Sequence, residues 1–184
     1  MPLPSPQSQT RPLPDALREA QDRYIATWSQ MGSAWGISRT MAEVHALLYI
    51  TGEALCTDEV MDRLEISRGS ASMSLRALLD WGVITRTHKR GDRKEYFLAE
   101  QDVWAMFRAI VRERMKREVD PMLASLFEIR DMTGGLGAIA KDHDDRLDQL
   151  LLFFEVMQMF GQRFISPTGE GLQAAADILS KNDA

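Results

Sequence analysis

Apolar residues recur at steps of three and four along most of this chain, and this spacing predicts amphipathic helices rather than strands. The first stripe begins soon after Asp15 and predicts one long helix that ends near Trp35. Its members are Leu17, Ala20, Tyr24, Trp28, Met31 and Trp35. Because these steps come close to a heptad repeat, the stripe is expected to face the protein core or a partner helix rather than to form a ligand cage.

The middle of the chain combines two short helical patterns with two extended ones. Thr57 is expected to cap the first helix and Ser67 the second, because a hydroxyl at that position accepts a hydrogen bond from a free backbone N–H. The second helix has a buried stripe and ends at Gly82. The stripe consists of Ala71, Leu75, Leu78 and Leu79. Residues 83–88 then suit a strand, and residues 91–92 suit the turn of a hairpin.

The other side of that second helix carries small hydroxyl groups and arginines. Small side chains allow a helix to approach the major groove of DNA closely, while arginine reaches guanine edges or phosphates. The candidate DNA contacts on this helix are Ser67, Arg68, Gly69, Ser70, Ser72, Met73, Ser74 and Arg76. The hairpin that follows is cationic, so it can lie along the DNA backbone or enter a minor groove. Its candidate contacts are His88, Lys89, Arg90, Arg93 and Lys94.

The positive charge of the chain is concentrated in this region. Between Ile66 and Lys94 there are seven basic and two acidic residues, a balance of +5, whereas the whole chain carries −5. A local basic patch on an acidic chain favours a nucleic-acid partner over an ordinary solvated surface. The sequence therefore predicts a winged helix-turn-helix that binds double-stranded DNA. A sequence-tolerant, nucleoid-type DNA binder and a winged-helix module that binds protein remain open as alternatives.

The helix and hairpin resemble those of the GbsR-type branch of the MarR-like transcriptional regulators. The resemblance rests on SRGSASMSLRALLDWGVI at residues 67–84 and on GDRKEYF at residues 91–97, and a looser similarity extends over residues 20–130. It implies a homodimeric, DNA-binding regulator, often a repressor, that in some relatives responds to a small molecule.

Two further long helices are predicted after the hairpin. The first covers roughly residues 102–130, with Asp102 as its N-cap and a kink or division near Pro121. A glycine-rich break at residues 133–137 separates it from a second helix at residues 141–164. The second helix is apolar on more than one face, so a second subunit is expected to cover part of it. The candidate dimer interface consists of Leu147, Leu150, Leu151, Phe154, Met157 and Phe160.

Together these elements predict a mainly α fold with a small two-stranded β-wing, in which a winged helix-turn-helix is combined with long dimerisation helices. The expected parts are a disordered, proline-rich arm (1–14), an N-terminal dimerisation or core helix (15–36), a winged helix-turn-helix domain (37–100) and a C-terminal helical dimerisation region (101–184). A short helix is expected after Ser166.

Nothing in the sequence indicates an enzyme. GxSxG, HExxH, paired CxxC and dinucleotide motifs are absent and the three histidines are scattered, so no catalytic residue, metal site or cofactor is predicted. The acidic run at residues 142–145 contains metal-ligand types, but adjacent helical positions point in different directions. The single cysteine, Cys56, excludes an internal disulfide and fits a cytoplasmic protein. No uncharged run reaches the roughly 18 residues of a membrane span, so no membrane partner is expected.

Because relatives in this family respond to ligands, the resemblance implies a small-molecule effector site, and the aromatic residues permit one between the DNA-binding and dimerisation regions. Its candidate walls are Tyr24, Trp28, Trp35, Trp104 and Phe107. Aromatic walls suit a quaternary ammonium compound such as choline or betaine through cation–π attraction, and a flat apolar molecule nearly as well. The alternative is that these rings are packed core. The resulting expectation is a dimeric, sequence-specific repressor that the effector releases from its operator.

Overall fold

The computed structural model describes residues 14–166. The expected arm at residues 1–14, except for Pro14, lies outside the described residues, as does the short helix expected after Ser166.

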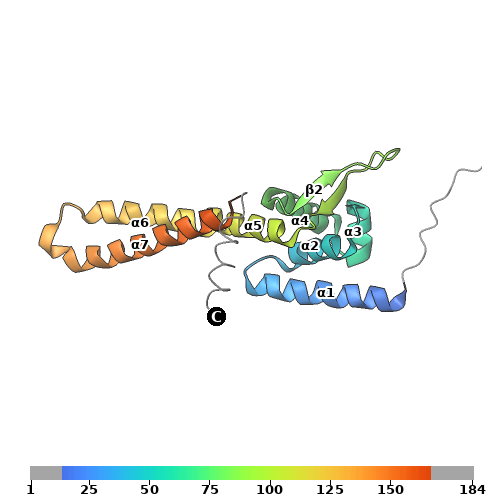
Figure 1. The fold of residues 1–184 in the computed structure, drawn as a ribbon, viewed down its shortest axis with the longest axis horizontal. Helices are drawn as coiled ribbons and strands as arrows, with labels where there is room; N and C mark the ends of the chain where they lie inside the picture. The colour runs from blue at the N-terminus through green and yellow to red at the C-terminus, as the bar shows by residue number, and fades with distance from the viewer. Residues whose placement is uncertain (1–13, 167–184) are drawn as a thin grey trace, which may run out of the picture. The chain divides into compact units, whose positions relative to one another are not determined.

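The described chain forms two compact units. The first contains residues 14–80 and 84–99, and the second contains residues 81–83 and 100–166. Helices dominate both units, and the first also holds a small antiparallel sheet (Figure 1). The prediction of a mainly α fold with a winged sheet is therefore confirmed.

The described part of the first unit contains four helices and three short strands. They are α1 (Asp15–Ala34), α2 (Arg39–Thr51), β1 (Leu55–Cys56), α3 (Thr57–Leu64), α4 (Arg68–Trp81), β2 (Ile84–Thr87) and β3 (Tyr96–Ala99). The core lies where α2, α3 and α4 meet the sheet, and its most completely buried side chains are Val44, Leu47, Leu48, Val60, Leu75 and Ile84. Gly82 ends α4 with a φ of +70°, a conformation that glycine adopts without strain.

The sheet has three strands rather than the two that were expected. β3 lies in the middle and is antiparallel to both β1 and β2. β1 pairs Leu55 with Phe97 and Cys56 with Tyr96. A strand of two residues is too short to show an alternating pattern in the sequence, and only its pairing with β3 defines it. This pairing ties the base of the wing to the start of α3.

α1 packs most closely on α2 through a line of buried residues beside the apolar stripe, which the sequence assigned to the core or to a partner helix. The buried positions of α1 are Gln21, Ile25, Ser29 and Gly32. A Cβ on Gly32 would lie 2.8 Å from the Cβ of Ala42, so the two helix backbones approach too closely for large side chains. Leu17 and Trp35, at the ends of the stripe, are 46% and 49% exposed. The stripe therefore flanks the helix contact and leaves part of its apolar surface in solvent.

The described part of the second unit is helical. Its elements are α5 (Val103–Arg114), the π-helical segment η1 (Met115–Val119), α6 (Asp120–Thr133), the 3-10 turn η2 (Gly137–Ile139) and α7 (Lys141–Phe164). Asp102 caps α5 as predicted, since its Oδ1 accepts hydrogen bonds from the N–H groups of Trp104 (2.8 Å) and Ala105 (3.2 Å). Pro121 lies in the first turn of α6, and the wider turn of η1 directly before it accommodates the missing proline N–H. The boundary between η1 and α6 thus lies where a kink or division was predicted, although the backbone stays helical across it.

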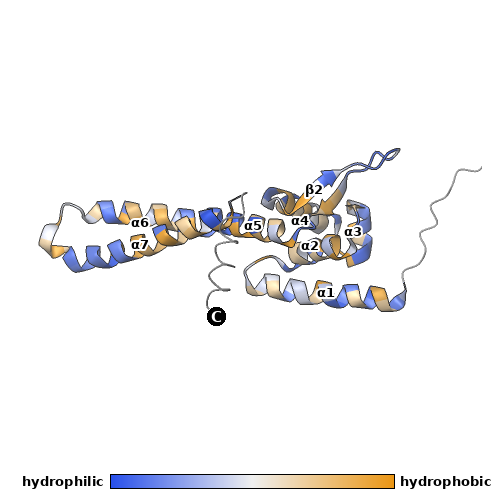
Figure 2. Cartoon of the chain, in the orientation of Figure 1, coloured by the Kyte–Doolittle hydropathy of each residue, from blue (hydrophilic) through white to orange (hydrophobic). Residues whose placement is uncertain are grey.

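α6 and α7 run side by side as a helical hairpin (Figure 1). Its core consists of Leu123, Leu126, Leu147 and Leu151, with Phe154 packed against it. Arg130 of α6 bridges to Asp144 (3.1 Å) and Asp148 (2.7 Å) of α7 near the turn. Further apolar residues recur along both helices (Figure 2). Among residues 14–166, no helix combines the length and the hydropathy that crossing a membrane would require.

Candidate nucleic-acid interface

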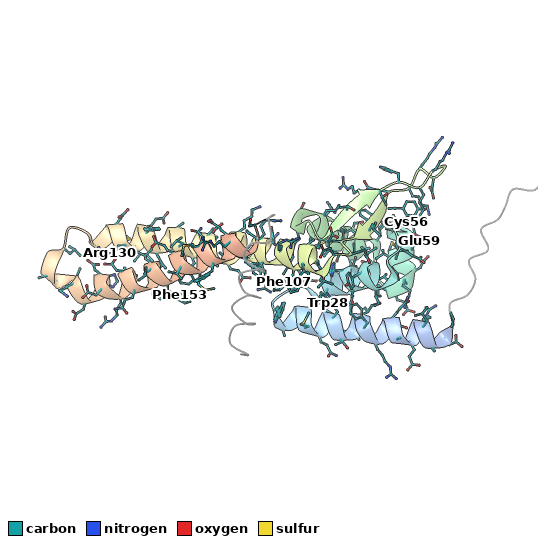
Figure 3. All side chains as sticks on the ribbon, in the orientation of Figure 1. Trp28, Cys56, Glu59, Phe107, Arg130 and Phe153 are labelled. Atoms are coloured by element: carbon teal, nitrogen blue, oxygen red, sulfur yellow. The ribbon has the colours of Figure 1, made fainter. Side chains whose placement is uncertain are left out.

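A helix-turn-helix is formed by α3, a short turn and α4. α3 is capped by Cys56 and not by Thr57: the Glu59 carboxylate accepts a hydrogen bond from the Cys56 N–H (2.7 Å), and Figure 3 labels both residues at the start of this helix. The expectation for Thr57 was wrong because strand β1 holds Cys56 in an extended conformation directly before the helix. Ser67 caps α4 as expected, since its Oγ accepts a hydrogen bond from the Ser70 N–H (3.2 Å).

α4 exposes one face beside its buried stripe. Arg68, Met73 and Arg76 are exposed, and Met73 is 68% accessible although it is apolar. Ser70 and Ser72 are partly exposed on the same side, as expected for positions three or four residues apart. An exposed helical face made of arginines, small hydroxyls and one flexible apolar side chain can enter a major groove and read base edges.

Ser74 does not belong to this face. It is 7% exposed and lies three residues after Ala71 and four before Leu78, which places it on the buried stripe. The expectation that its hydroxyl lies near a phosphate is therefore wrong. Gly69, by contrast, is exposed, and among the described residues a Cβ there would meet nothing closer than the Ser67 Oγ at 3.8 Å.

The β2–β3 hairpin carries its cations in solvent. The exposed residues are His88, Lys89, Arg90, Arg93 and Lys94. Asp92 fixes the turn, because its carboxylate accepts hydrogen bonds from the Tyr96 hydroxyl (2.6 Å) and from the Lys94 N–H (2.9 Å). The first of these bonds raises the pKa of Tyr96 to about 12. The Nζ of Lys89 lies 4.1 Å from the centre of the Tyr96 ring, within cation–π range. The wing is thus ordered at its base and cationic at its tip.

Asp58, in the first turn of α3, joins α4 to the β2–β3 wing. Its Oδ1 accepts a hydrogen bond from the Arg68 guanidinium (2.6 Å), and its Oδ2 accepts one from the Lys94 ammonium (3.1 Å). The Lys94 and Arg68 hydrogen bonds lower the pKa of Asp58, and the same contact raises the pKa of Lys94. Sequence reasoning missed this residue, because Lys94 is 36 positions away and a helical N-terminus is an ordinary place for an acid.

The aromatic residues suggested for an effector site are divided between the two units. In the first unit, Tyr24 stacks on Trp28 with ring centres 5.9 Å apart, and His45 and Tyr49 of α2 complete the cluster at 5.7 to 6.3 Å. His45 is buried, and this burial lowers its pKa to about 4, so the ring is neutral. These four rings pack on one another across α1 and α2.

The other suggested aromatic residues lie elsewhere. Trp35 is half-exposed at the end of α1. In the second unit Trp104 is exposed, and Phe107 meets Phe164 edge to face with ring centres 5.4 Å apart. Phe107 is therefore packed against its own unit, and Figure 3 labels it on α5.

The six residues suggested for a dimer interface also divide. Leu147 and Leu151 are buried in the α6–α7 core, and Phe154 packs against that core. Leu150, Met157 and Phe160 are exposed, Phe160 by 64%. The exposed group therefore remains open for contact with another chain, while the first three residues hold the hairpin together. Among residues 14–166, no cluster of three or more His, Cys, Asp or Glu side chains is arranged to hold a metal ion.

Comparisons with known proteins place these features in context. The chain is 27% identical over 139 residues to the HTH-type transcriptional repressor GbsR of Bacillus subtilis (strain 168), and the match covers 75% of this chain and 77% of the relative. It is 23% identical over 91 residues to the putative HTH-type transcriptional regulator YvaV of the same organism, covering 50% of this chain and 51% of the relative. No protein-family model matches the chain.

A solved structure shares the fold. The protein described as "Crystal Structure of a transcriptional regulator" superimposes with a TM-score of 0.57 at 20% identity, over 79% of this chain and 95% of that one. Both the fold and the sequence similarity thus agree with the resemblance carried by α4 and the wing, and the chain is homologous to the GbsR-type helix-turn-helix regulators.

Proposed function

We propose that this protein is a transcriptional regulator that binds double-stranded DNA through α4 and the β2–β3 wing. The observation that carries the proposal is one exposed cationic surface, made by the α4 face around Arg68 and Arg76 and by the wing, on a chain whose net charge is −5. Homology to proteins named as helix-turn-helix regulators supports it. Residues 37–100 are then the DNA-binding domain.

The helix and the wing have different tasks. α4 lies in the major groove, where Arg68, Ser70, Met73 and Arg76 face base edges and the adjacent phosphates. The wing cations contact the sugar–phosphate backbone or a minor groove, so they add affinity for any sequence. Specificity therefore comes mainly from α4, and the salt dependence comes mainly from the wing.

The regulator acts as a homodimer assembled through α7 and α1. On α7, Leu150, Phe153, Met157 and Phe160 recur at steps of three, four and three, and all four are exposed. An apolar stripe of this length is unfavourable in water and suits burial against the same stripe of a second copy. A two-fold axis places the two recognition helices on the order of 34 Å apart, over a near-palindromic site.

Repression and its release by a ligand complete the proposal. The relative named as a repressor supports repression. The Tyr24–Trp28 pair is partly exposed, and its remaining aromatic surface suits a quaternary ammonium ligand. Such a ligand acts only if it binds one arrangement of the recognition helices more tightly than another, and a tenfold loss of operator affinity requires about 1.4 kcal/mol of difference.

The test begins with the DNA. Duplexes selected by the protein from a random-sequence library should converge on a near-palindrome, and genome-wide mapping should find that site upstream of a small set of genes. A scrambled duplex of equal length and composition serves as the control. Equal affinity for both duplexes would favour a nucleoid-type binder, and no binding to either would favour a protein-interaction module.

The effector is tested separately, by titrating the protein–operator complex with choline, glycine betaine and small aromatic compounds. Tryptophan fluorescence reports binding and anisotropy of a labelled operator reports release. The Trp28→Phe variant, which keeps an aromatic ring, shows whether a fluorescence change arises at that residue. Absence of both signals with all of these compounds would remove the effector from the proposal.

A further inference from the structure

Two of the cations on the proposed DNA-binding surface differ from the others in being held by a carboxylate. Arg68 at the start of α4 and Lys94 at the base of the wing share Asp58, one on each oxygen, at 2.6 and 3.1 Å. Within residues 14–166, the structure gives no ion pair to Lys89, Arg90 or Arg93. No carboxylate therefore neutralises these three cations within the described residues, while the two cations nearest to the helix-turn-helix are partly neutralised.

This arrangement is open to exchange. The side chains of Asp58, Arg68 and Lys94 are 43%, 68% and 53% exposed, so all three are in contact with water. Exposed ion pairs are weak and readily exchange partners. A DNA phosphate is an alternative anion for both cations.

We propose that Asp58 tunes the affinity of this surface for DNA by competing with phosphates for Arg68 and Lys94. This inference rests on the proposed DNA-binding function. On any duplex, each of the two cations gains a phosphate but loses its carboxylate, so the net gain from the exchange is small. Because the same ion pairs are lost on the operator and on other DNA, Asp58 lowers the affinity for both.

Replacing Asp58 by asparagine tests the idea. Asp58→Asn keeps the size of the side chain and raises the net charge of the trio from +1 to +2. Affinity for a scrambled duplex should rise roughly fivefold, as two freed surface ion pairs allow, and affinity for the duplex selected from a random library should rise by a similar factor. The slope of log K against log salt concentration on the scrambled duplex should steepen by about 0.9, the contribution of one more phosphate contact.

Asp62→Asn is the matched control. Asp62 is an exposed acid one helical turn further along α3, and in the described residues it takes part in no ion pair with Arg68 or Lys94. It changes the net charge by the same amount, so a general charge effect would appear in both variants. The competition predicts that Asp58→Asn raises the affinity for both duplexes by more than Asp62→Asn does. Circular dichroism melting of each variant verifies that the helix-turn-helix is folded.

A double-mutant cycle with Lys94→Gln separates competition from bracing. If Asp58 competes, Lys94→Gln should weaken binding to the scrambled duplex more in the Asp58→Asn background than in the wild type. If Asp58 instead braces the wing, Asp58→Asn should weaken binding to both duplexes, and that result would overturn the inference. Equal behaviour of Asp58→Asn and Asp62→Asn would also overturn it while leaving DNA binding intact. Failure of the wild type to bind either duplex would instead refute the proposed function.

Discussion

Replacing Gly32 by alanine should destabilise the first unit, although alanine is the better helix former. The added Cβ would lie 2.8 Å from the Cβ of Ala42, whereas carbon atoms in contact are normally about 3.5–4.0 Å apart. Neither atom can be moved by rotating a side chain, because the backbone fixes the position of a Cβ. α1 and α2 must therefore separate by most of 1 Å, and the buried contact of Ile25 and Ser29 loosens with them.

The expected size follows from two opposing effects. Overpacking a tight contact costs about 1–3 kcal/mol. The change from glycine to alanine within a helix returns about 1 kcal/mol. The net loss in the free energy of unfolding should therefore be up to about 2 kcal/mol. Gly161→Ala is the matched control, because its Cβ would also lie 2.8 Å from a neighbour, but that neighbour is the flexible end of Met115. A rotamer change of Met115 costs about 1 kcal/mol, so this variant should be close to neutral.

Urea denaturation followed by circular dichroism measures both variants. In an Ala42→Gly background the clash is removed, and Gly32→Ala should then stabilise the protein by up to about 1 kcal/mol. If Gly32→Ala is as stable as the wild type while Ala42 is present, the close approach of α1 and α2 is not what requires glycine, and the reasoning fails.

The remaining predictions concern DNA binding, assembly and pH. Arg76→Ala should weaken binding to the selected duplex by about 1–3 kcal/mol and relax base preference at one position of each half-site. Arg90→Ala should instead weaken binding to all duplexes and flatten the slope of log K against log salt concentration by about 0.9. Anisotropy titrations at several salt concentrations distinguish these outcomes, and an unchanged non-specific affinity of Arg90→Ala would contradict the role of the wing. Phe153→Asp should yield a folded monomer in sedimentation experiments, and a dimeric Phe153→Asp protein would exclude this face of α7 from the interface. Leu151→Asp should instead lower the helical content measured by circular dichroism, because Leu151 is part of the core of the α6–α7 hairpin. His45 has a pKa lowered by burial from 6.5 to about 4, so its stabilising effect is complete above pH 6.5 and is lost as the pH falls towards 4. The free energy of unfolding should therefore be about 2 kcal/mol lower at pH 5 than at pH 7, and His45→Gln should abolish most of that difference.

Local chemistry was sufficient to predict where most elements begin and end. Asp102 caps α5, Ser67 caps α4 and Gly82 ends it, since each acts on backbone groups within four residues. Pro121 marks the boundary between η1 and α6 for the same reason, because the missing N–H and the ring affect only the preceding turn. These features depend on neighbours in the sequence, so the sequence alone reveals them.

The faces that helices bury were predicted less well. The apolar stripe of α1 marked a side of the helix, but the closest contact with α2 lies beside it, at Ser29 and Gly32, and only Tyr24 and Trp28 of the stripe contact rings of α2. Two helices whose axes lie close together require small residues where they touch. The distance between the axes is set by the packed pair, so the sequence of one helix does not reveal it. In the same way, α7 was known to be apolar on several faces, but only the partner helix α6 decided that Leu151 is internal and Phe160 is exposed.

The sequence by itself determined that a helix-turn-helix with a cationic wing lies near the middle of the chain, because caps, apolar spacing and charge density are all local quantities. The tertiary structure decided which of these residues are accessible and what they contact. It buried Ser74, moved the cap of α3 to Cys56 through the pairing of β1 with β3, and brought Lys94 to Asp58 across 36 positions. Such contacts depend on where strands and helices meet in space, and a single sequence carries no periodic pattern that records them.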